Sequence, residues 1–171
     1  MHPEILSIAL FWFVTAYTPG PNNVVASYSG FNFGIMKTIP HILGVTLGFT
    51  SLVIFLTIGL INVFKLFPII QVIIKYLGTI FLIYLAYKIA SSTNSDETKK
   101  ENPVKFLETF LFQYLNPKGV MVAIIVVSTY VELGENYISY ATQVVVLAFL
   151  FSSTSITLWT FIGKFLRKFA T

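Results

Sequence analysis

The stretch "YTPGPNNVV", residues 17–25, interrupts a long apolar run near the N-terminus and decides how the chain folds. Proline has no backbone N–H, so Pro19 and Pro21 cannot donate to the carbonyls of Thr15 and Tyr17 as helical residues would. A residue that precedes proline also avoids helical backbone angles. The sequence therefore predicts a helix that opens around residues 18–21.

A second stretch, "QYLNPKGV" at 113–120, repeats this pattern in another apolar run. Pro117 frees the carbonyl of Gln113 and disfavours helix at Asn116. The uninterrupted pieces beside the two breaks, 5–17 and 119–131, would each form roughly 20 Å of helix. A bilayer core is about 30 Å thick, so both breaks are predicted to lie near its middle.

The composition places the chain in a membrane. It has 171 residues, of which 56% are hydrophobic and 11% are charged, whereas a soluble domain has roughly 25% charged residues. There is no cysteine, the two histidines lack metal-ligand spacing, and no phosphate-binding loop occurs. These features predict a protein that is not an enzyme and needs no cofactor or metal. The net charge of +4 fits membrane orientation better than binding to nucleic acid.

Five apolar runs are long enough to cross a bilayer as helices, at about 5–30, 39–64, 68–90, 106–131 and 138–162. The second run is expected to begin with Pro40 in its first turn. The runs are too long and unbroken for the strands of a membrane barrel. We predict an all-α, polytopic membrane protein forming a single transmembrane domain over 1–171, with half-repeats at about 1–90 and 104–171. The polar segment 91–103 is the predicted cytoplasmic loop.

Basic residues predict the orientation, because cytoplasmic ends of membrane helices are enriched in Lys and Arg. With the N-terminus outside and the C-terminus cytoplasmic, eight basic residues lie inside, two outside, and Lys118 lies within the membrane. The inside set is Lys37, Lys88, Lys99, Lys100, Lys105, Lys164, Arg167 and Lys168, and the outside set is Lys65 and Lys75.

Paired interruptions in the two halves of a membrane protein indicate a transporter binding site. The half-helices that start near Asn22 and Gly119 would aim N–H groups at the midplane, where they attract carboxylates. Lys118 adds a full positive charge, and the freed carbonyls could accept hydrogen bonds from an ammonium group. The pattern favours a small zwitterion such as an amino acid. The alternatives are that the breaks are packing kinks, that Lys118 extends towards an interface, and that the asparagines only cap helices.

Other residues are open to plainer interpretations. His41 is expected at the cytoplasmic interface, although a proton-relay role is an alternative. The glycine pairs Gly30/Gly34 and Gly44/Gly48 have the spacing of close helix contacts. They predict tight packing, with homodimer formation as a further option.

The two broken motifs, "TPGPNNVV" and "LNPKGVMV", together with "KYLGTIFLIYLAYKI" at 75–89, resemble the lysine-exporter (LysE/RhtB) family of bacterial amino-acid efflux proteins. The resemblance covers nearly the whole chain. It implies a multi-pass protein of the bacterial inner membrane that exports amino acids, driven by the proton gradient. It also implies that the substrate site contains Thr18, Pro19, Gly20, Pro21, Asn22, Asn116, Pro117 and Lys118.

The sequence departs from the family pattern at two points. Relatives often have an aspartate just after the second-helix glycine, where this chain has Phe49 after Gly48. Relatives usually have a sixth helix, and none follows 138–171 here, so the chain is expected to be shortened, to be completed by a homodimer partner, or to need only five. The alternatives to amino-acid efflux are export of another small solute and a role as a non-transporting membrane subunit or scaffold.

Overall fold

The computed structural model of the protein describes residues 1–60, 66–70, 104–132 and 134–170, and positions 72, 73, 76, 77, 79, 80, 83 and 87. These residues are helical wherever they form regular structure, which confirms the all-α prediction. The predicted loop 91–103 and most of the predicted span 68–90 lie outside the described residues. The elements are α1 (Ile5–Tyr17), α2 (Pro21–Phe55), η1 (Leu56–Leu60), α5 (Phe106–Leu115), α6 (Pro117–Tyr130) and α7 (Tyr137–Ala170).

Both predicted helix breaks are present. Helix α1 ends at Tyr17, Thr18 and Gly20 have extended backbone angles, and α2 begins at Pro21. Helices α5 and α6 are separated by Asn116 alone, which has φ −74° and ψ 105°, and their axes bend by 59°. In each case a proline occupies the first turn of the following helix, where its missing N–H costs no hydrogen bond. The prolines therefore end one helix and start the next.

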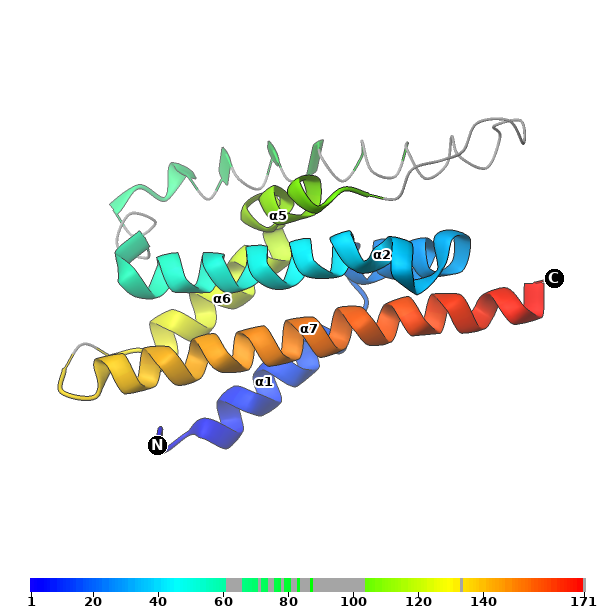
Figure 1. Cartoon of the computed structure of the whole chain (residues 1–171). Coiled ribbons are helices and arrows are strands. Elements are labelled where there is room, and N and C mark those ends of the chain that lie inside the picture. The colour runs from blue at the N-terminus through cyan, green and yellow to red at the C-terminus, as the bar shows by residue number, and fades with distance from the viewer. Residues whose placement is uncertain are drawn as a thin grey trace.

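Helix α2 doubles back on itself at Gly34, whose φ of 76° and ψ of 176° lie in a region that favours glycine. The turn divides α2 into a first arm, 21–33, and a second arm, 35–55 (Figure 1). The hydroxyls of Ser29 and Thr38 share a hydrogen bond of 2.8 Å across the two arms. The prediction that Pro40 starts the second span was wrong, because the second arm begins after Gly34 and Pro40 lies inside it.

The described helices reach two opposite ends of the molecule. The N-terminus and the α6–α7 turn lie at one end, and the Gly34 turn, the start of α5 and the C-terminus lie at the other (Figure 1). At the first end the His2 backbone N–H donates to the Gln143 side chain over 2.9 Å, and the Tyr137 hydroxyl donates to the Thr57 carbonyl. Helices α2 and α7 are each long and apolar enough to cross a membrane, and α5 with α6 forms a bent third candidate.

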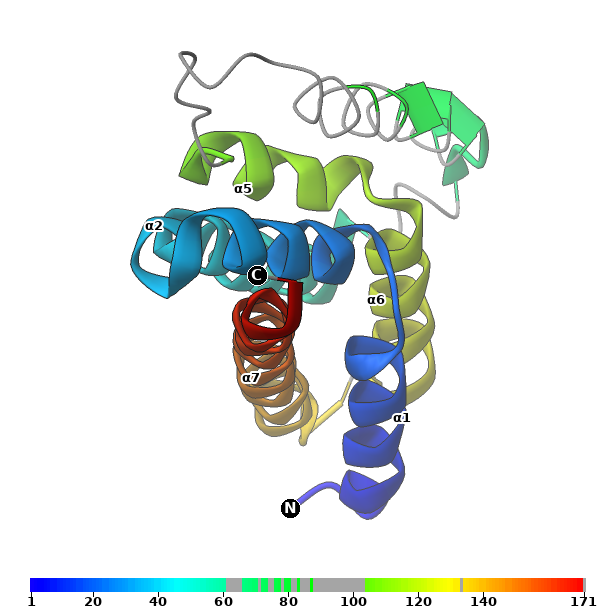
Figure 2. The same cartoon turned by 90° about the vertical axis from the view of Figure 1, so that its right-hand side faces the viewer.

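Helix α7 packs along α2, with α5 on the far side of α2 and with α1 and α6 beside them (Figure 2). Glycine allows the closest approaches. A Cβ at Gly163 would overlap the Ser27 carbonyl, and one at Gly30 would overlap the Thr160 carbonyl. Gly44 and Gly48 do the same against α5. The glycine pairs therefore serve packing within the chain, except Gly34, which makes the turn.

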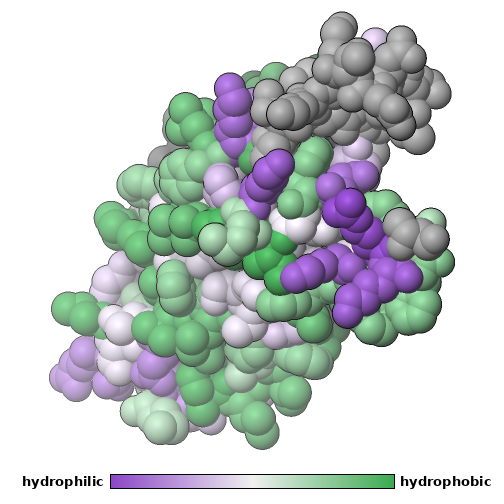
Figure 3. Space-filling view, turned by 45° about the vertical axis from the view of Figure 1, so that its right-hand side comes forward, coloured by the Kyte–Doolittle hydropathy of each residue, from purple (hydrophilic) through white to green (hydrophobic). Residues whose placement is uncertain are grey.

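The outer surfaces of the helices are apolar. Side chains that are between 43 and 55% exposed point outward from several helices, among them Leu10, Leu43, Leu47, Ile125 and Phe161. Figure 3 shows hydrophobic residues over most of one face, with the most hydrophilic ones gathered towards its upper right. Soluble monomers rarely expose apolar patches of this extent, whereas a polytopic membrane protein covers them with lipid.

The contact between α2 and α5 generates a prediction for stability. A Cβ at Gly48 would lie 2.6 Å from the Phe110 carbonyl oxygen and 2.9 Å from Cγ of Gln113. We expect Gly48→Leu to destabilise the protein by about 1–3 kcal/mol or more, because both neighbours must shift. Thermal unfolding in detergent measures the effect, and Leu47→Met, on the lipid-facing side of the same helix, is the control. An unchanged midpoint for Gly48→Leu would show that α5 does not pack here.

Candidate functional site

The two helix breaks face each other and are joined by Lys118. Its Nζ, carried by the first turn of α6, donates to the Thr18 carbonyl over 2.9 Å and contacts the Thr18 hydroxyl at 3.0 Å. The Pro19 carbonyl lies 3.5 Å from the same nitrogen. The ammonium therefore lies at the carbonyl end of α1, where the helix dipole favours a cation.

A second link joins Asn22, at the start of α2, to Gln113, near the end of α5. The Asn22 amide nitrogen donates to Oε1 of Gln113 over 2.8 Å, and Nε2 of Gln113 donates back to Oδ1 of Asn22 over 3.2 Å. The same Nε2 also donates to the Thr109 carbonyl over 2.8 Å. Gln113 is fully buried, so this reciprocal pair satisfies polar groups that would otherwise be costly inside the protein.

The carbonyls released at the end of α1 are satisfied by side chains from α2 and α7. Nδ2 of Asn23 donates to the carbonyls of Ala16 and Thr18 over 2.8 and 2.9 Å. Ser155 donates to the Ala16 carbonyl over 2.8 Å, and the Trp159 indole donates to that of Tyr17 over 3.3 Å. The Thr15 carbonyl accepts from the Thr18 hydroxyl over 3.1 Å. The sequence suggested that the carbonyls of Thr15 and Tyr17 could accept hydrogen bonds from the ammonium group of a substrate. In the structure both carbonyls already accept hydrogen bonds from side chains of the protein.

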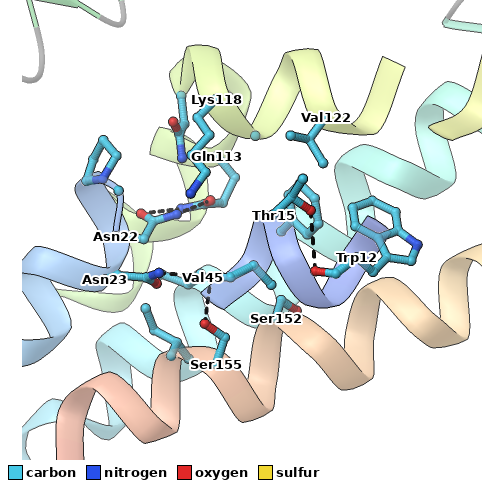
Figure 4. A pocket seen from close by; sticks show the side chains of 17 residues that line it. Trp12, Thr15, Asn22, Asn23, Val45, Gln113, Lys118, Val122, Ser152 and Ser155 are labelled. Atoms are coloured by element: carbon cyan, nitrogen blue, oxygen red, sulfur yellow. Dashed lines mark hydrogen bonds between the residues drawn. The ribbon is translucent and has the colours of Figure 1, made fainter. Parts of the chain in front are cut away.

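A cavity of about 80 Å³ lies between the breaks (Figure 4). One water molecule needs at least ~10–15 Å³ measured in this way, so the cavity has room for several water-sized groups, the size class of a small metabolite. Its walls come from both breaks, both arms of α2, and α7. The lining residues are Trp12, Thr15, Ala16, Gly20, Pro21, Asn22, Asn23, Val45, Phe49, Gln113, Asn116, Lys118, Gly119, Val122, Ser152, Ser155 and Ile156.

Five of the eight predicted site residues line this cavity: Gly20, Pro21, Asn22, Asn116 and Lys118. Thr18 and Pro19 are exposed and present their carbonyls to Lys118, and Pro117 starts α6 beside the cavity. Sequence reasoning missed the contributions of α7, Ser152 and Ser155, because no pattern in that apolar helix marks its polar face. It also missed Trp12, whose ring meets that of Phe49 edge-to-face at a centroid distance of 5.5 Å. Phe49 was noted only as the residue that replaces an aspartate of relatives, and it lines the cavity.

Comparison with known proteins identifies the family. The family model described as "LysE type translocator" matches residues 13–170. The chain belongs to this family. Membership agrees with the predicted resemblance and with the prediction of a membrane transporter rather than an enzyme.

Several curated proteins resemble this translocator over almost its whole length. The cysteine/O-acetylserine efflux protein of Salmonella typhimurium (strain LT2) is 30% identical over 171 residues, covering 98% of this chain and 87% of the relative. The protein of the same name from Escherichia coli (strain K12) is 27% identical over 172 residues with the same coverage. No solved structure matches the translocator.

The first residues of helices α2 and α6 line the cavity of the translocator. The first intrahelical bonds after the breaks are from Val24 N–H to the Gly20 carbonyl and from Val120 N–H to the Asn116 carbonyl, both 2.9 Å. The N–H groups of residues 22, 23, 118 and 119 precede those bonds, so they make no bond within their own helix. Such groups favour an anion, and Lys118 lies beside them as the one charged residue among the described lining residues.

One lining residue of the cavity has an amide oxygen without a partner. Oδ1 of Asn116 is buried and accepts no hydrogen bond from the residues that the structure describes, and Asn116 as a whole is 3% exposed. An unsatisfied buried amide oxygen costs about 1–3 kcal/mol, which a bound hydrogen-bond donor would recover. The cavity thus combines apolar walls with a few converging polar groups, the usual anatomy of a small-molecule site.

His41 differs from its expected place at the interface. It is 1% exposed, inside the second arm of α2, and its Nε2 lies 3.2 Å from the Asn22 carbonyl oxygen. The prediction was wrong because the second arm begins well before Pro40 and packs against the first arm, which covers the imidazole.

The Asn22–Gln113 pair generates a prediction for stability. Asn22→Ala leaves Oε1 of the buried Gln113 without its donor, and Gln113→Ala leaves the Asn22 amide without its partner, so the double variant should lose less than the sum of the two single losses. We expect a coupling of about 0.5–3 kcal/mol in a double-mutant cycle followed by unfolding in detergent.

A matched cycle pairs Asn22→Ala with Asn32→Ala. Asn32 is exposed and bonds the Tyr28 carbonyl at the other end of the first arm, so these two changes should be additive. Additive losses for Asn22 and Gln113 as well would contradict direct contact between the two breaks.

Proposed function

We propose that this translocator exports small amino acids, or close derivatives of them, across the bacterial inner membrane. The observation that carries the proposal is the cavity between two facing helix breaks, which is lined by Lys118 and by the first residues of α2 and α6. Relatives matched over 98% of the chain bear the name cysteine/O-acetylserine efflux protein. Both observations favour a small zwitterion without a second charge.

The cavity offers partners for both ends of such a molecule. Its carboxylate would lie against the amino ends of α2 and α6 and take over the Lys118 ammonium, which now bonds the Thr18 carbonyl. Its ammonium would donate to Oδ1 of Asn116, which has no partner among the described residues. The described part of the cavity wall holds no carboxylate, so a cationic side chain would find no counter-charge there.

The two helix breaks could also act as hinges for the conformational change that transport requires. Each is a short extended segment between rigid helices, and such segments absorb changes in backbone angle. We propose that half-repeats 1–90 and 104–171 move against each other around the cavity within one transporter domain, exposing it alternately to each face. We further propose that a proton gradient drives export, since the sequence has no phosphate-binding loop of the P-loop pattern.

The charges of the described residues support an N-out, C-in orientation. The end of the molecule with the Gly34 turn and the C-terminus carries Lys37, Lys105, Glu108, Lys164, Arg167 and Lys168. The end with the N-terminus and the α6–α7 turn carries Glu4, Glu132 and Glu135. Because basic residues are retained on the cytoplasmic side, the first end would face the cytoplasm.

Flux from proteoliposomes tests the proposal. We expect purified protein to release cysteine and O-acetylserine under an imposed pH gradient, and to release lysine far more slowly. Release of an unrelated small solute alone would favour export of another substrate class, and no flux of any solute would favour a scaffold role. Either result would overturn the proposal.

Lys118→Ala should lower the rate of amino-acid flux about tenfold or more. The change removes a charge-assisted hydrogen bond to the substrate carboxylate, worth about 1.5–3 kcal/mol. Lys37 is an exposed lysine near the start of the second arm, so Lys37→Ala is the matched control and should transport normally. Because Lys118 also bonds the end of α1, unfolding of both variants is measured alongside. Normal flux through folded Lys118→Ala would remove Lys118 from the substrate site.

A further inference from the structure

His41 is a buried titratable residue that the substrate cavity does not use directly. It lies in the second arm of α2, is 1% exposed, and contacts the first arm through the Asn22 carbonyl, 3.2 Å from its Nε2. Asn22 itself lines the cavity and pairs with Gln113. The imidazole therefore contacts a residue that lines the proposed substrate site, at the amino end of α2, without lining the site itself.

The bonding of the ring defines its protonation state in this conformation. Because the partner of Nε2 is a carbonyl oxygen, Nε2 carries a hydrogen and donates it. In the neutral ring Nδ1 then carries no hydrogen and has a free lone pair. Nδ1 is buried and has no hydrogen-bond partner in the part of the chain that the structure describes. A second proton at Nδ1 would thus place a charge and an unpaired donor inside the protein, where both are costly.

Charged neighbours do not offset that cost. Several titratable groups lie on the described elements packed around the arms of α2. They are Tyr17 on α1, Tyr28 and Lys37 on α2 itself, Lys105, Glu108 and Tyr114 on or beside α5, Lys118 and Tyr130 on α6, and Tyr137, Tyr140, Lys164, Arg167 and Lys168 on α7. None of them bonds the His41 ring: Lys118 contacts Thr18 and Pro19, and Glu108 accepts from the Lys105 backbone N–H over 3.4 Å. Protonation at Nδ1 therefore requires a different arrangement of the two arms.

We propose that His41 is the proton-binding residue that couples the proton gradient to export, an inference that rests on the proposed transport function. In the conformation described here the ring is neutral and the arms of α2 are closed over it. When a proton binds, the arms separate until the Nδ1–H reaches water or another acceptor. Since Asn22 is bonded to both His41 and Gln113, this movement displaces a wall of the substrate cavity.

The proton balance of the cycle is simple. One N–H bond forms at Nδ1 with a proton from water at the outer face, and the same bond breaks when the ring releases it to water at the inner face. No other bond changes. The proton and the substrate bind to different conformations, which interconvert by movement of the same two arms of α2. Binding of either ligand must therefore alter the affinity of the protein for the other.

A measurement of the gradient sustained at steady state tests the role of His41. With the membrane potential held at zero, an exchanger of one proton per substrate sustains about a tenfold substrate gradient per pH unit, since both correspond to about 1.4 kcal/mol. His41→Gln cannot titrate but can still donate an N–H to the Asn22 carbonyl. We expect this variant to exchange cysteine across the membrane in the absence of a pH gradient. When a pH gradient is imposed, the ratio of cysteine concentrations on the two sides should stay near one.

His2→Gln is the matched control, because His2 is the other histidine of the chain. It lies at the opposite end of the molecule from the Gly34 turn, its Nε2 is 3.0 Å from the Tyr130 carbonyl oxygen, and it should sustain the full gradient. A full gradient in His41→Gln would overturn the proposal while leaving the transport function intact. Loss of exchange as well, in both His41→Gln and His41→Asn, would also overturn it, because His41 would then serve folding or binding. Absence of any flux in the unaltered protein would instead refute the transport function.

Discussion

Backbone groups that a membrane helix releases must find partners inside the protein, because lipid offers none. This constraint governs the structure around both breaks. Pro19, Pro21 and Pro117 open two helices, and the released carbonyls of α1 are bonded by Asn23, Ser155, Trp159 and Lys118. These four donors come from three other helices. The break in α1 is therefore stable only while α2, α6 and α7 are packed against it.

The same requirement explains why the cavity lies where it does. Polar side chains that bond the released carbonyls must converge on the break. The apolar residues packed among them fill the remaining space only in part, and the cavity is what is left. The amino ends of α2 and α6 border that space because each helix restarts at a proline. The proposed site for a zwitterion thus results from the way in which the chain satisfies the backbone groups that its own helix breaks release. Lys118 serves both purposes, as a partner for Thr18 and as a charge at the cavity.

The sequence predicted the features that depend on local chemistry. Proline removes an N–H wherever it occurs, so the breaks at residues 18–20 and 116 could be placed from three residues. Helix lengths and bilayer thickness predicted that the two breaks lie at a similar depth. Resemblance to known efflux proteins pointed to the family, which the family comparison then established. Five of eight proposed site residues line the cavity for these reasons.

Features that depend on tertiary contact could not be predicted. Ser155 and Trp159 lie in an apolar run whose polar residues look scattered until α7 is packed against α1. Gly34 was interpreted as a packing residue, although its left-handed conformation makes the turn within α2. That turn sets the register of the two arms, and the register decides that His41 is buried against Asn22 and not placed at an interface. A single misplaced turn therefore changed the interpretation of a functional candidate.

The facing of the two breaks is the central claim, and disulfide formation in this cysteine-free chain measures it directly. A Cβ at Gly20 would lie 3.1 Å from Cδ of Lys118, which is two bonds beyond the Cβ of that residue. The pair Gly20→Cys and Lys118→Cys should therefore form a disulfide under mild oxidation in membranes after a small shift of the two breaks. The pair Gly20→Cys and Tyr130→Cys, at the opposite end of α6, should not. Peptide mass spectrometry that finds the second link and not the first would contradict the account, because the breaks could not then enclose a common cavity.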